Sequence, residues 1–323
     1  MPSPFDIEEI YPDEAPTPRL PRRQAGTSPQ SVAVTLLADY TLRTRAPLPS
    51  AAIVELLAET GVTSAGARTA ISRLARRGVL EGSRQGRNSF YRLSRGAAAD
   101  LSAGGSWIVA STADTHAWDG SWTVVAFSLP QDRGTQRRAL RGQLRWLGFA
   151  PLYDGLWISP YELAEPARSR LAQLAPGAVT VFRGRQDALD VTGQRAPVDA
   201  WDIAAISAQY EEFLRRWTPL ASRLESVDGP AAVRARTEVM DTYRRFPTLD
   251  PRLPLELLPA GWLRRPARDL FTAVYDGLAE PAQRHVRAVV ARFADPVPPG
   301  IQAHTTADML AGVREDACGA GPD

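Results

Sequence analysis

The chain has 323 residues, of which 44% are hydrophobic, so it is long enough to form two or three domains with real cores. Its 38 basic residues are all arginine and leave a net charge of only +2, which excludes a uniformly polycationic protein and any chemistry that needs a Schiff-base or P-loop lysine. The single cysteine, Cys318, excludes an internal disulfide or a thiolate metal site. The sequence contains no run of about 18 apolar residues, which a membrane-spanning helix would need. A cytoplasmic protein is therefore expected.

The N-terminal segment, residues 1–27, contains six prolines and shows little periodicity. Its acidic residues are followed by Arg19, Arg22 and Arg23. A segment of this composition buries too little apolar surface to fold, so it is predicted to be a mostly disordered arm. A solvated tail is the simpler interpretation, and a DNA contact by the three arginines is the alternative.

Residues 28–96 show the order helix, helix, short turn, helix and two-stranded hairpin. A Gly-rich turn at 82–86 leads into the second hairpin strand at 89–93. This order is typical of a winged helix-turn-helix domain. The expected caps and stops are Ser50 and Gly61 for the second helix, and Ser64 and Gly78 for the third.

Residues 97–117 are rich in Ala, Gly, Ser and Thr and are predicted to be a linker. Residues 118–190 then show a strand, a helix, two strands joined by Asp154-Gly155, a helix and a final strand. Asp-Gly between short apolar runs is a strong hairpin signal. The order β-α-β-β-α-β predicts a ferredoxin-like domain.

Residues 198–295 repeat apolar side chains at spacings of three and four, which predicts an all-α C-terminal domain. Residues 296–323 are expected to form a disordered tail. The sequence as a whole therefore predicts a multi-domain α+β protein.

Residues 64–95 carry the strongest functional signal in the chain. They hold eight arginines against one acid, Glu81, which gives a local charge of +7 in a chain whose total is +2. Such segregation is the expected footprint of phosphate binding, and arginine favours bidentate contacts to phosphate and guanine. A solvated basic face without a partner is the alternative.

The third helix of this segment is expected to turn Ala67, Ala70, Ile71 and Leu74 toward the core, which leaves the opposite face for DNA. Side chains near the helix start would reach base edges, and later ones would contact phosphates. The predicted recognition-helix residues are Ser64, Arg68, Thr69, Ser72, Arg73, Arg76 and Arg77. The predicted wing residues, which would lie along the backbone or the minor groove, are Arg84, Gln85, Arg87, Asn88 and Arg92.

Other chemistry has little support in the sequence. The three histidines, His116, His285 and His304, are far apart and lack metal-ligand spacing. Nucleophile-elbow, zincin and dinucleotide-binding motifs are missing. The sequence therefore predicts no catalytic residue, metal or cofactor, and the protein is not expected to be an enzyme.

Several stretches together resemble the PaaX family of bacterial transcriptional repressors. The resemblance covers roughly residues 29–294. The matching stretches are AISRL at 70–74, GRNSFYRL at 86–93, WDGSW at 118–122, LGFAPL at 147–152, GLWISP at 155–160, WD at 201–202, YRRF at 243–246 and ELLP at 256–259. The resemblance implies a winged helix, a Cas2-like (ferredoxin-like) dimerisation domain and a helical C-terminal domain. It also implies a homodimer that binds a pseudo-palindromic operator in double-stranded DNA.

The resemblance further implies a small-molecule effector. The best-known family members repress phenylacetate catabolism genes and release DNA on binding phenylacetyl-CoA, so an aryl- or acyl-CoA thioester is expected here. Arginines would hold its phosphates, and an apolar pocket between the middle and C-terminal domains would hold its acyl group. The candidate residues are Arg133, Arg137, Tyr243 and Arg244, for which a structural role is the alternative.

Two other functions stay open at this point. A Cas2-like domain suggests a metal-dependent nuclease, but such nucleases rely on an Asp at the end of the first strand. The strand at 122–129 has no acid, and Asp132 follows only after Pro130. A DNA-binding activator or architectural protein without a small-molecule effector is the other alternative.

Overall fold

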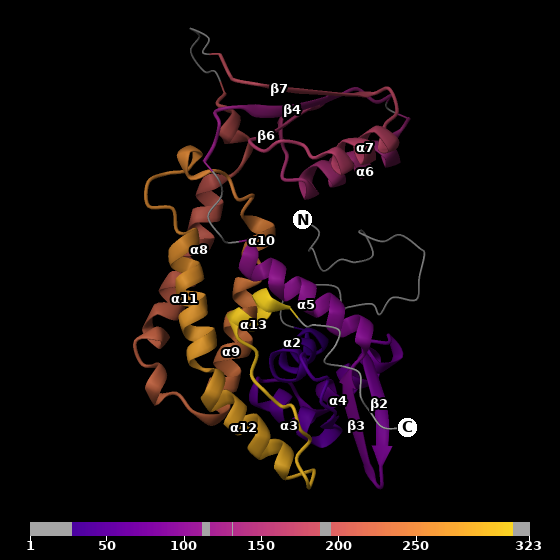
Figure 1. The fold of residues 1–323 in the computed structure, drawn as a ribbon, viewed down its shortest axis with the longest axis vertical. Helices are drawn as coiled ribbons and strands as arrows, with labels where there is room; N and C mark the ends of the chain where they lie inside the picture. Colours follow the sequence, from indigo (N-terminus) through magenta and orange to yellow (C-terminus); the bar gives the residue numbers. More distant parts are fainter. Residues whose placement is uncertain (1–27, 112–116, 131, 188–194, 313–323) are drawn as a thin grey trace. The chain divides into compact units, whose positions relative to one another are not determined.

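A computed structural model describes residues 28–111, 117–130, 132–187 and 195–312. The predicted N-terminal arm, residues 1–27, lies outside the described residues. The chain divides into two compact units (Figure 1). Unit 1 contains residues 1–113, 210–249 and 264–323, and unit 2 contains residues 114–209 and 250–263.

Unit 1 begins with three helices and a small sheet. The helices are α2 (Pro29–Thr41), α3 (Ser50–Glu59) and α4 (Ser64–Arg76), and the strands are β1 (Leu48–Pro49), β2 (Leu80–Gln85) and β3 (Asn88–Leu93). The strands are antiparallel in the order β1-β3-β2, so β2 and β3 form a hairpin with β1 beside β3.

The helix caps differ from those expected. The Thr63 hydroxyl, not that of Ser64, caps α4 by accepting the backbone N–H of Gly66 at 3.1 Å. Ser50 is already inside α3, which follows Pro49 and has no side-chain cap. Proline is suited to helix starts because it fixes φ and brings no N–H of its own.

Residues 97–110, most of the predicted linker, form a helix instead, and residues 112–116 lie outside the described part of the chain. Helix α5 (Arg95–Ala110) begins after Ser94, whose hydroxyl accepts the N–H of Ala97. Its small residues let α13 (Thr306–Ala311) pack closely, since a Cβ at Gly105 would lie 3.4 Å from Met309 Cγ. Small-residue composition here therefore reflects helix packing and not a flexible connection.

The remainder of unit 1 is helical. It contains most of α8 (Ile203–Ala221), η2 (Leu224–Ser226), α9 (Gly229–Tyr243), α10 (Phe246–Leu249), α11 (Arg264–Gly277) and α12 (Ala279–Ala291). Aromatic rings fill the core between these helices, and the Tyr243 ring stacks on Phe271 with centroids 4.0 Å apart. The predicted helical character of this region is confirmed.

The expected disordered tail is partly ordered. The N–H groups of Gln302 and His304 donate to the carbonyl oxygens of Tyr40 and Asp39 at 3.0 and 2.7 Å, and Ile301 is buried. The prediction is thus wrong for residues 296–312, because Ile301 and Ala303 are buried and the backbone beside them is hydrogen-bonded to α2. Residues 313–323 lie outside the described part of the chain.

Unit 2 is built on a four-stranded antiparallel sheet. Its elements in chain order are β4 (Trp122–Phe127), α6 (Gly134–Trp146), β5 (Ala150–Tyr153), β6 (Leu156–Ser159), α7 (Glu165–Leu174) and β7 (Val179–Gly184). The strand order is β5-β6-β4-β7. At the β5–β6 turn, Gly155 has φ +74°, and a Cβ there would lie 2.7 Å from the Phe127 carbonyl oxygen, so only glycine fits.

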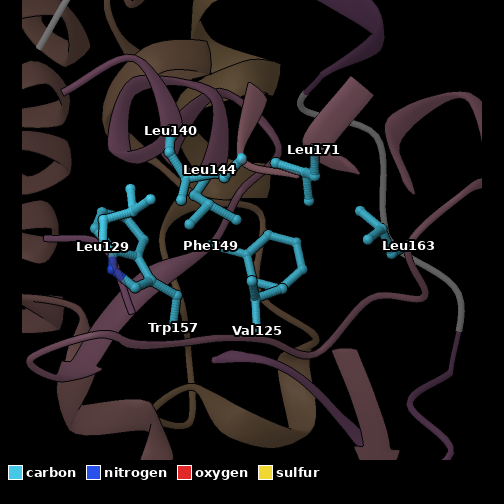
Figure 2. Close-up of a cluster of buried hydrophobic side chains, with 9 residues drawn as sticks. Val125, Leu129, Leu140, Leu144, Phe149, Trp157, Leu163 and Leu171 are labelled. Atoms are coloured by element: carbon cyan, nitrogen blue, oxygen red, sulfur yellow. The ribbon is translucent and has the colours of Figure 1, made fainter. Parts of the chain in front are cut away.

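Helices α6 and α7 pack on one face of this sheet. Leu140 and Leu144 of α6 meet Val125 and Trp157 of the sheet in a buried cluster (Figure 2). On the other face, Trp122 packs against Trp118 and Trp201. Two short turns complete unit 2, namely η1 (Pro197–Ala200) and η3 (Leu255–Leu257).

Within the described ranges, no helix is both long enough and apolar enough to cross a membrane.

Candidate nucleic-acid interface

Helix α4 turns an apolar face inward and a basic face outward. The predicted inner residues Ala67, Ala70, Ile71 and Leu74 are all buried. The predicted outer residues are exposed, namely Ser64, Arg68, Thr69, Ser72, Arg73 and Arg76. At the helix start, a Cβ added to Gly66 would lie 3.0 Å from the Thr63 hydroxyl oxygen, so glycine leaves this capping contact unstrained.

Two predicted recognition residues have partners inside the protein. Arg77 is half-buried and donates to the Gln30 side chain of α2 at 3.2 Å. The Thr69 hydroxyl donates to the Ala65 carbonyl at 2.9 Å. Arg77 thus connects α4 to α2, while Arg68, Arg73 and Arg76 extend from the surface.

The β2–β3 hairpin ends in a tight turn with Gly86 at φ +59°. The first central position of a type II′ turn requires this conformation, and the register pairs Gln85 with Asn88 around it. The side chains of Arg84, Gln85 and Arg87 are exposed at the tip. Asn88 is exposed too, but its amide donates to the Phe293 carbonyl at 3.5 Å.

Glu81 neutralises part of the hairpin. Its carboxylate accepts from Arg92 Nε at 2.9 Å and from Arg45 Nη2 at 2.8 Å. Arg45 is buried, has φ +53° and also donates to the Leu93 carbonyl. Sequence reasoning missed Arg45 because it lies in a loop without periodicity, far along the chain from Glu81.

The remaining arginines leave an unneutralised basic surface. In the described part of the chain, no carboxylate lies within ion-pair distance of Arg68, Arg73, Arg76, Arg84 or Arg87. Unneutralised guanidinium groups on one helix and one adjacent hairpin attract phosphates and can form bidentate hydrogen bonds with them. Helix α4 and the hairpin tip are therefore the candidate nucleic-acid interface.

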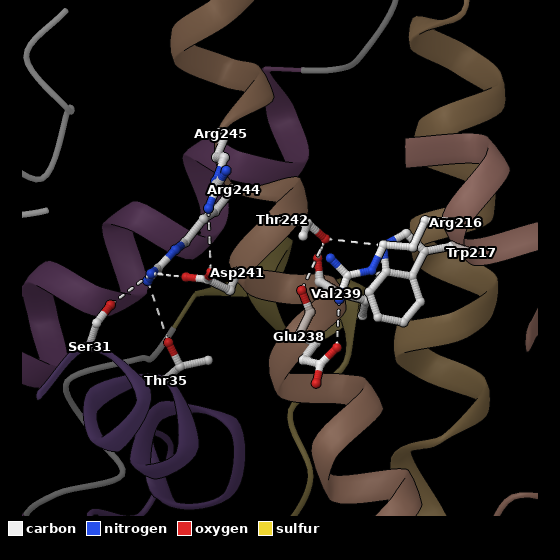
Figure 3. Close-up of polar contacts among 10 residues, drawn as sticks. All are labelled: Ser31, Thr35, Arg216, Trp217, Glu238, Val239, Asp241, Thr242, Arg244 and Arg245. Atoms are coloured by element: carbon white, nitrogen blue, oxygen red, sulfur yellow. Dashed lines mark hydrogen bonds and ion pairs between the residues drawn. The ribbon is translucent and has the colours of Figure 1, made fainter. Parts of the chain in front are cut away.

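The helices that follow in unit 1 brace this interface from behind. Glu59 of α3 contacts His285 Nε2 at 2.9 Å, and Glu55 pairs with Arg292. Arg244 donates to Ser31 at 2.8 Å and to Thr35 at 3.4 Å, and it pairs with Asp241 (Figure 3). These contacts fix α2 and α3, and through them the orientation of α4.

The four predicted effector residues are divided between the units. In unit 1, the Tyr243 ring is fully buried among aromatic side chains, and Arg244 is engaged by α2. In unit 2, Arg133 is exposed before α6, and Arg137 donates to the Leu129 carbonyl. A ligand would reach Tyr243 only by displacing the rings that cover it.

A nuclease of the Cas2 type would need an acidic residue on β4, but Trp122–Phe127 contains none. Asp132 is exposed in the loop that follows. Among the described residues, no three His, Cys, Asp or Glu side chains lie where they could hold a metal ion together.

Family models match three successive stretches of the chain. The PaaX-like protein model matches residues 28–97, that of the PaaX protein central Cas2-like domain matches 115–196, and that of the PaaX-like protein C-terminal domain matches 201–288.

Individual relatives agree with these matches. The Transcriptional repressor PaaX of Escherichia coli is 34% identical over 222 residues, which are 67% of this chain and 69% of the relative. The solved structure of an uncharacterised protein from Mycobacterium tuberculosis has a TM-score of 0.57 at 22% identity, covers 82% of this chain and 99% of that one, and so shows the fold alone.

The helices, the two small sheets and the Cas2-like central domain define a multi-domain α+β protein. The chain belongs to the PaaX family.

Proposed function

We propose that this protein is a transcriptional repressor that acts in the cytoplasm and binds operator DNA through α4 and the β2–β3 hairpin. The observation that carries the proposal is a set of exposed arginines on these two elements that have no carboxylate partner in the described residues, namely Arg68, Arg73, Arg76, Arg84 and Arg87. The name of its relative, a transcriptional repressor, supports the sign of regulation.

The proposed domain architecture explains how this surface would meet DNA. The order α2, α3, α4 and hairpin, with β1 beside β3, supports a winged helix whose third helix enters the major groove. In unit 2, the strand order β5-β6-β4-β7 with both helices on one face supports a ferredoxin-like arrangement.

The proposal extends to assembly and control. A homodimer would present two copies of α4 to a pseudo-palindromic operator, with half-sites about one helical turn or a multiple apart. An aryl- or acyl-CoA thioester such as phenylacetyl-CoA would release the DNA by binding better to a dimer geometry that does not fit the operator.

The first experiment measures fluorescence anisotropy of a labelled duplex from the gene's own upstream region, with a random duplex at the same salt as the control. Preferential binding to the upstream duplex, followed by release on adding phenylacetyl-CoA, is expected. Binding without release would sink this effector and leave the regulator intact. Equal binding to both duplexes would sink operator recognition.

Substitution of Arg73 tests the assignment of base contacts to α4. We expect Arg73→Ala to weaken operator binding by about 1–3 kcal/mol more than random-DNA binding, because a base contact is lost only on the operator. The matched control is Arg287→Ala, an exposed arginine on α12 of the same unit, which should change neither. Equal losses on both duplexes would show that Arg73 contacts phosphates only.

A further inference from the structure

Unit 2 contains a hollow of about 290 Å³ where the C-terminal half of α6 faces the β5–β6 hairpin. Its lining includes the three arginines Arg141, Arg145 and Arg195, together with Tyr153, Asp154 and Trp157. Three guanidinium groups against one carboxylate leave a local charge of +2. This hollow belongs to neither the α4 surface nor the effector residues expected from the sequence.

Each arginine is held in place by a different contact. Arg141 pairs with Asp154 at 2.8 Å. Arg195 donates to two backbone carbonyls, those of Leu152 at 2.6 Å and Asp199 at 2.9 Å. The guanidinium of Arg145 lies over the Trp157 ring, 5.4 Å from its centroid. These contacts restrict the three side chains before any ligand arrives, which lowers the entropic cost of binding one.

The charges of two of these arginines are not neutralised. Within the described ranges, no carboxylate lies within ion-pair distance of Arg145 or Arg195, whose contacts are an indole ring and neutral carbonyls. In addition, Nε of Arg141 is buried and has no hydrogen-bond partner among the described residues. Unneutralised guanidinium groups that converge on one hollow favour an anion with several oxygens.

The lining also suits a planar group beside the anion. Arg145 is exposed while its guanidinium rests over Trp157, and Tyr153 is exposed at the rim. Guanidinium and phenol groups both stack on aromatic rings. A volume near the lower end of ligand pockets, about 300 Å³, fits one phosphorylated headgroup and not a whole large cofactor.

We propose that this hollow binds the phosphate of a small phosphorylated ligand that carries a planar ring, of the nucleotide class. Coenzyme A thioesters belong to this class because they contain an adenosine phosphate group. The inference therefore rests on the part of the proposed function that names a coenzyme A thioester as the effector. Binding to the hollow is measured without DNA, and its outcome is thus separate from operator recognition.

The test is isothermal titration calorimetry of the full-length protein with adenosine 3′,5′-bisphosphate. Arg145→Gln and Arg195→Gln should each weaken binding by about tenfold, because each removes charge-assisted hydrogen bonds. The matched control is Arg138→Gln, an exposed arginine on the same helix that does not line the hollow, and it should change affinity by less than about twofold. Circular dichroism of each variant monitors folding.

Three results would overturn the proposal. The wild type could fail to bind the nucleotide, Arg138→Gln could weaken binding as much as the two hollow variants, or unphosphorylated adenosine could bind as tightly as the bisphosphate. A parallel titration with a random duplex tests whether the hollow binds the phosphates of the DNA backbone and not those of a free nucleotide. Loss of duplex binding in Arg145→Gln, without nucleotide binding by the wild type, would assign the hollow to the DNA backbone instead.

Discussion

Asp39 of α2 is a buried carboxylate in an unusual setting. Its Oδ1 accepts a hydrogen bond from the Tyr275 hydroxyl, and the fully buried Arg236 lies close enough to attract it electrostatically. The Arg236 guanidinium donates to the carbonyl oxygens of Tyr275 and His304 and lies 3.9 Å from the Tyr275 ring centroid. This cluster joins α2 to α9, α11 and the segment before α13.

Burial raises the pKa of Asp39 from 3.8 to about 6, although Arg236 and the Tyr275 hydrogen bond oppose the shift. At pH values between these two pKa values, Asp39 therefore holds a proton in the folded state more often than in the unfolded state. The free energy of unfolding must then fall as pH rises from about 4 to about 6, by up to about 3 kcal/mol.

Asp39→Asn should remove this pH dependence and keep the hydrogen bond from Tyr275. In urea unfolding at pH 4.5 and 7, we expect the wild type to lose more stability on raising the pH than Asp39→Asn does. Asp132→Asn, at an exposed position, is the control and should follow the wild type. Parallel pH profiles for the wild type and Asp39→Asn would contradict the assignment.

At the scale of elements, the hairpin offers a prediction about salt. Arg84→Ala and Arg87→Ala should each lower the slope of log affinity against log salt for DNA binding by about one, because each removes an unneutralised charge near phosphates. Arg92→Ala is the matched control within the same hairpin. Because Glu81 already pairs with Arg92, Arg92→Ala should change the slope of log affinity against log salt less than the other two substitutions do.

The measurement is anisotropy of a random duplex across a series of NaCl concentrations. An equal change in slope for Arg92→Ala and Arg87→Ala would show that the Glu81 pair opens on DNA. An unchanged slope for both Arg84→Ala and Arg87→Ala would remove the hairpin from the DNA interface.

The inner face of α4 could be predicted because it depends on local periodicity alone. The same holds for the Asp154-Gly155 turn, which the structure places between β5 and β6. Helix α5 could not be predicted in this way, since its Ala, Gly and Ser residues are stabilised by close packing on α13, almost 200 residues later. Such helices gain their stability from tertiary contacts more than from local propensity.

The partners of the site residues were equally hidden. Exposure of Arg68 and Arg73 followed from helix geometry, but the contacts that engage Arg77 and Arg92 come from Gln30 and Glu81 on other elements. The hollow beside α6 brings together residues from α6, β5 and the segment after β7, so no single stretch of sequence could reveal it.

At the scale of the molecule, residues 28–96, predicted as a winged-helix domain, share a core with helices far along the chain. Tyr40 is fully buried, and its carbonyl accepts from Gln302, while Glu59 contacts His285. The apolar surface of α2 and α3 is thus shared with α9, α12 and the C-terminal segment.

A fragment of residues 28–96 should therefore fold poorly by itself. We expect the full-length protein to unfold in a cooperative thermal transition and the fragment to lack one, because Asp39 and Tyr40 would be exposed without their partners. Circular dichroism with temperature checks this, with the full-length chain as the control. A sharp transition and dispersed amide resonances from the fragment would show that the first helices fold independently.

The segment around Gln302 also sets a schedule for synthesis. The ribosome makes α2 early, yet the segment whose backbone donates to Tyr40 and Asp39 emerges about 260 residues later. Domains that are local in sequence can fold as they leave the ribosome, whereas this core must wait for distant residues. Helix α2 therefore reaches its full burial only after the segment around Gln302 has been synthesised.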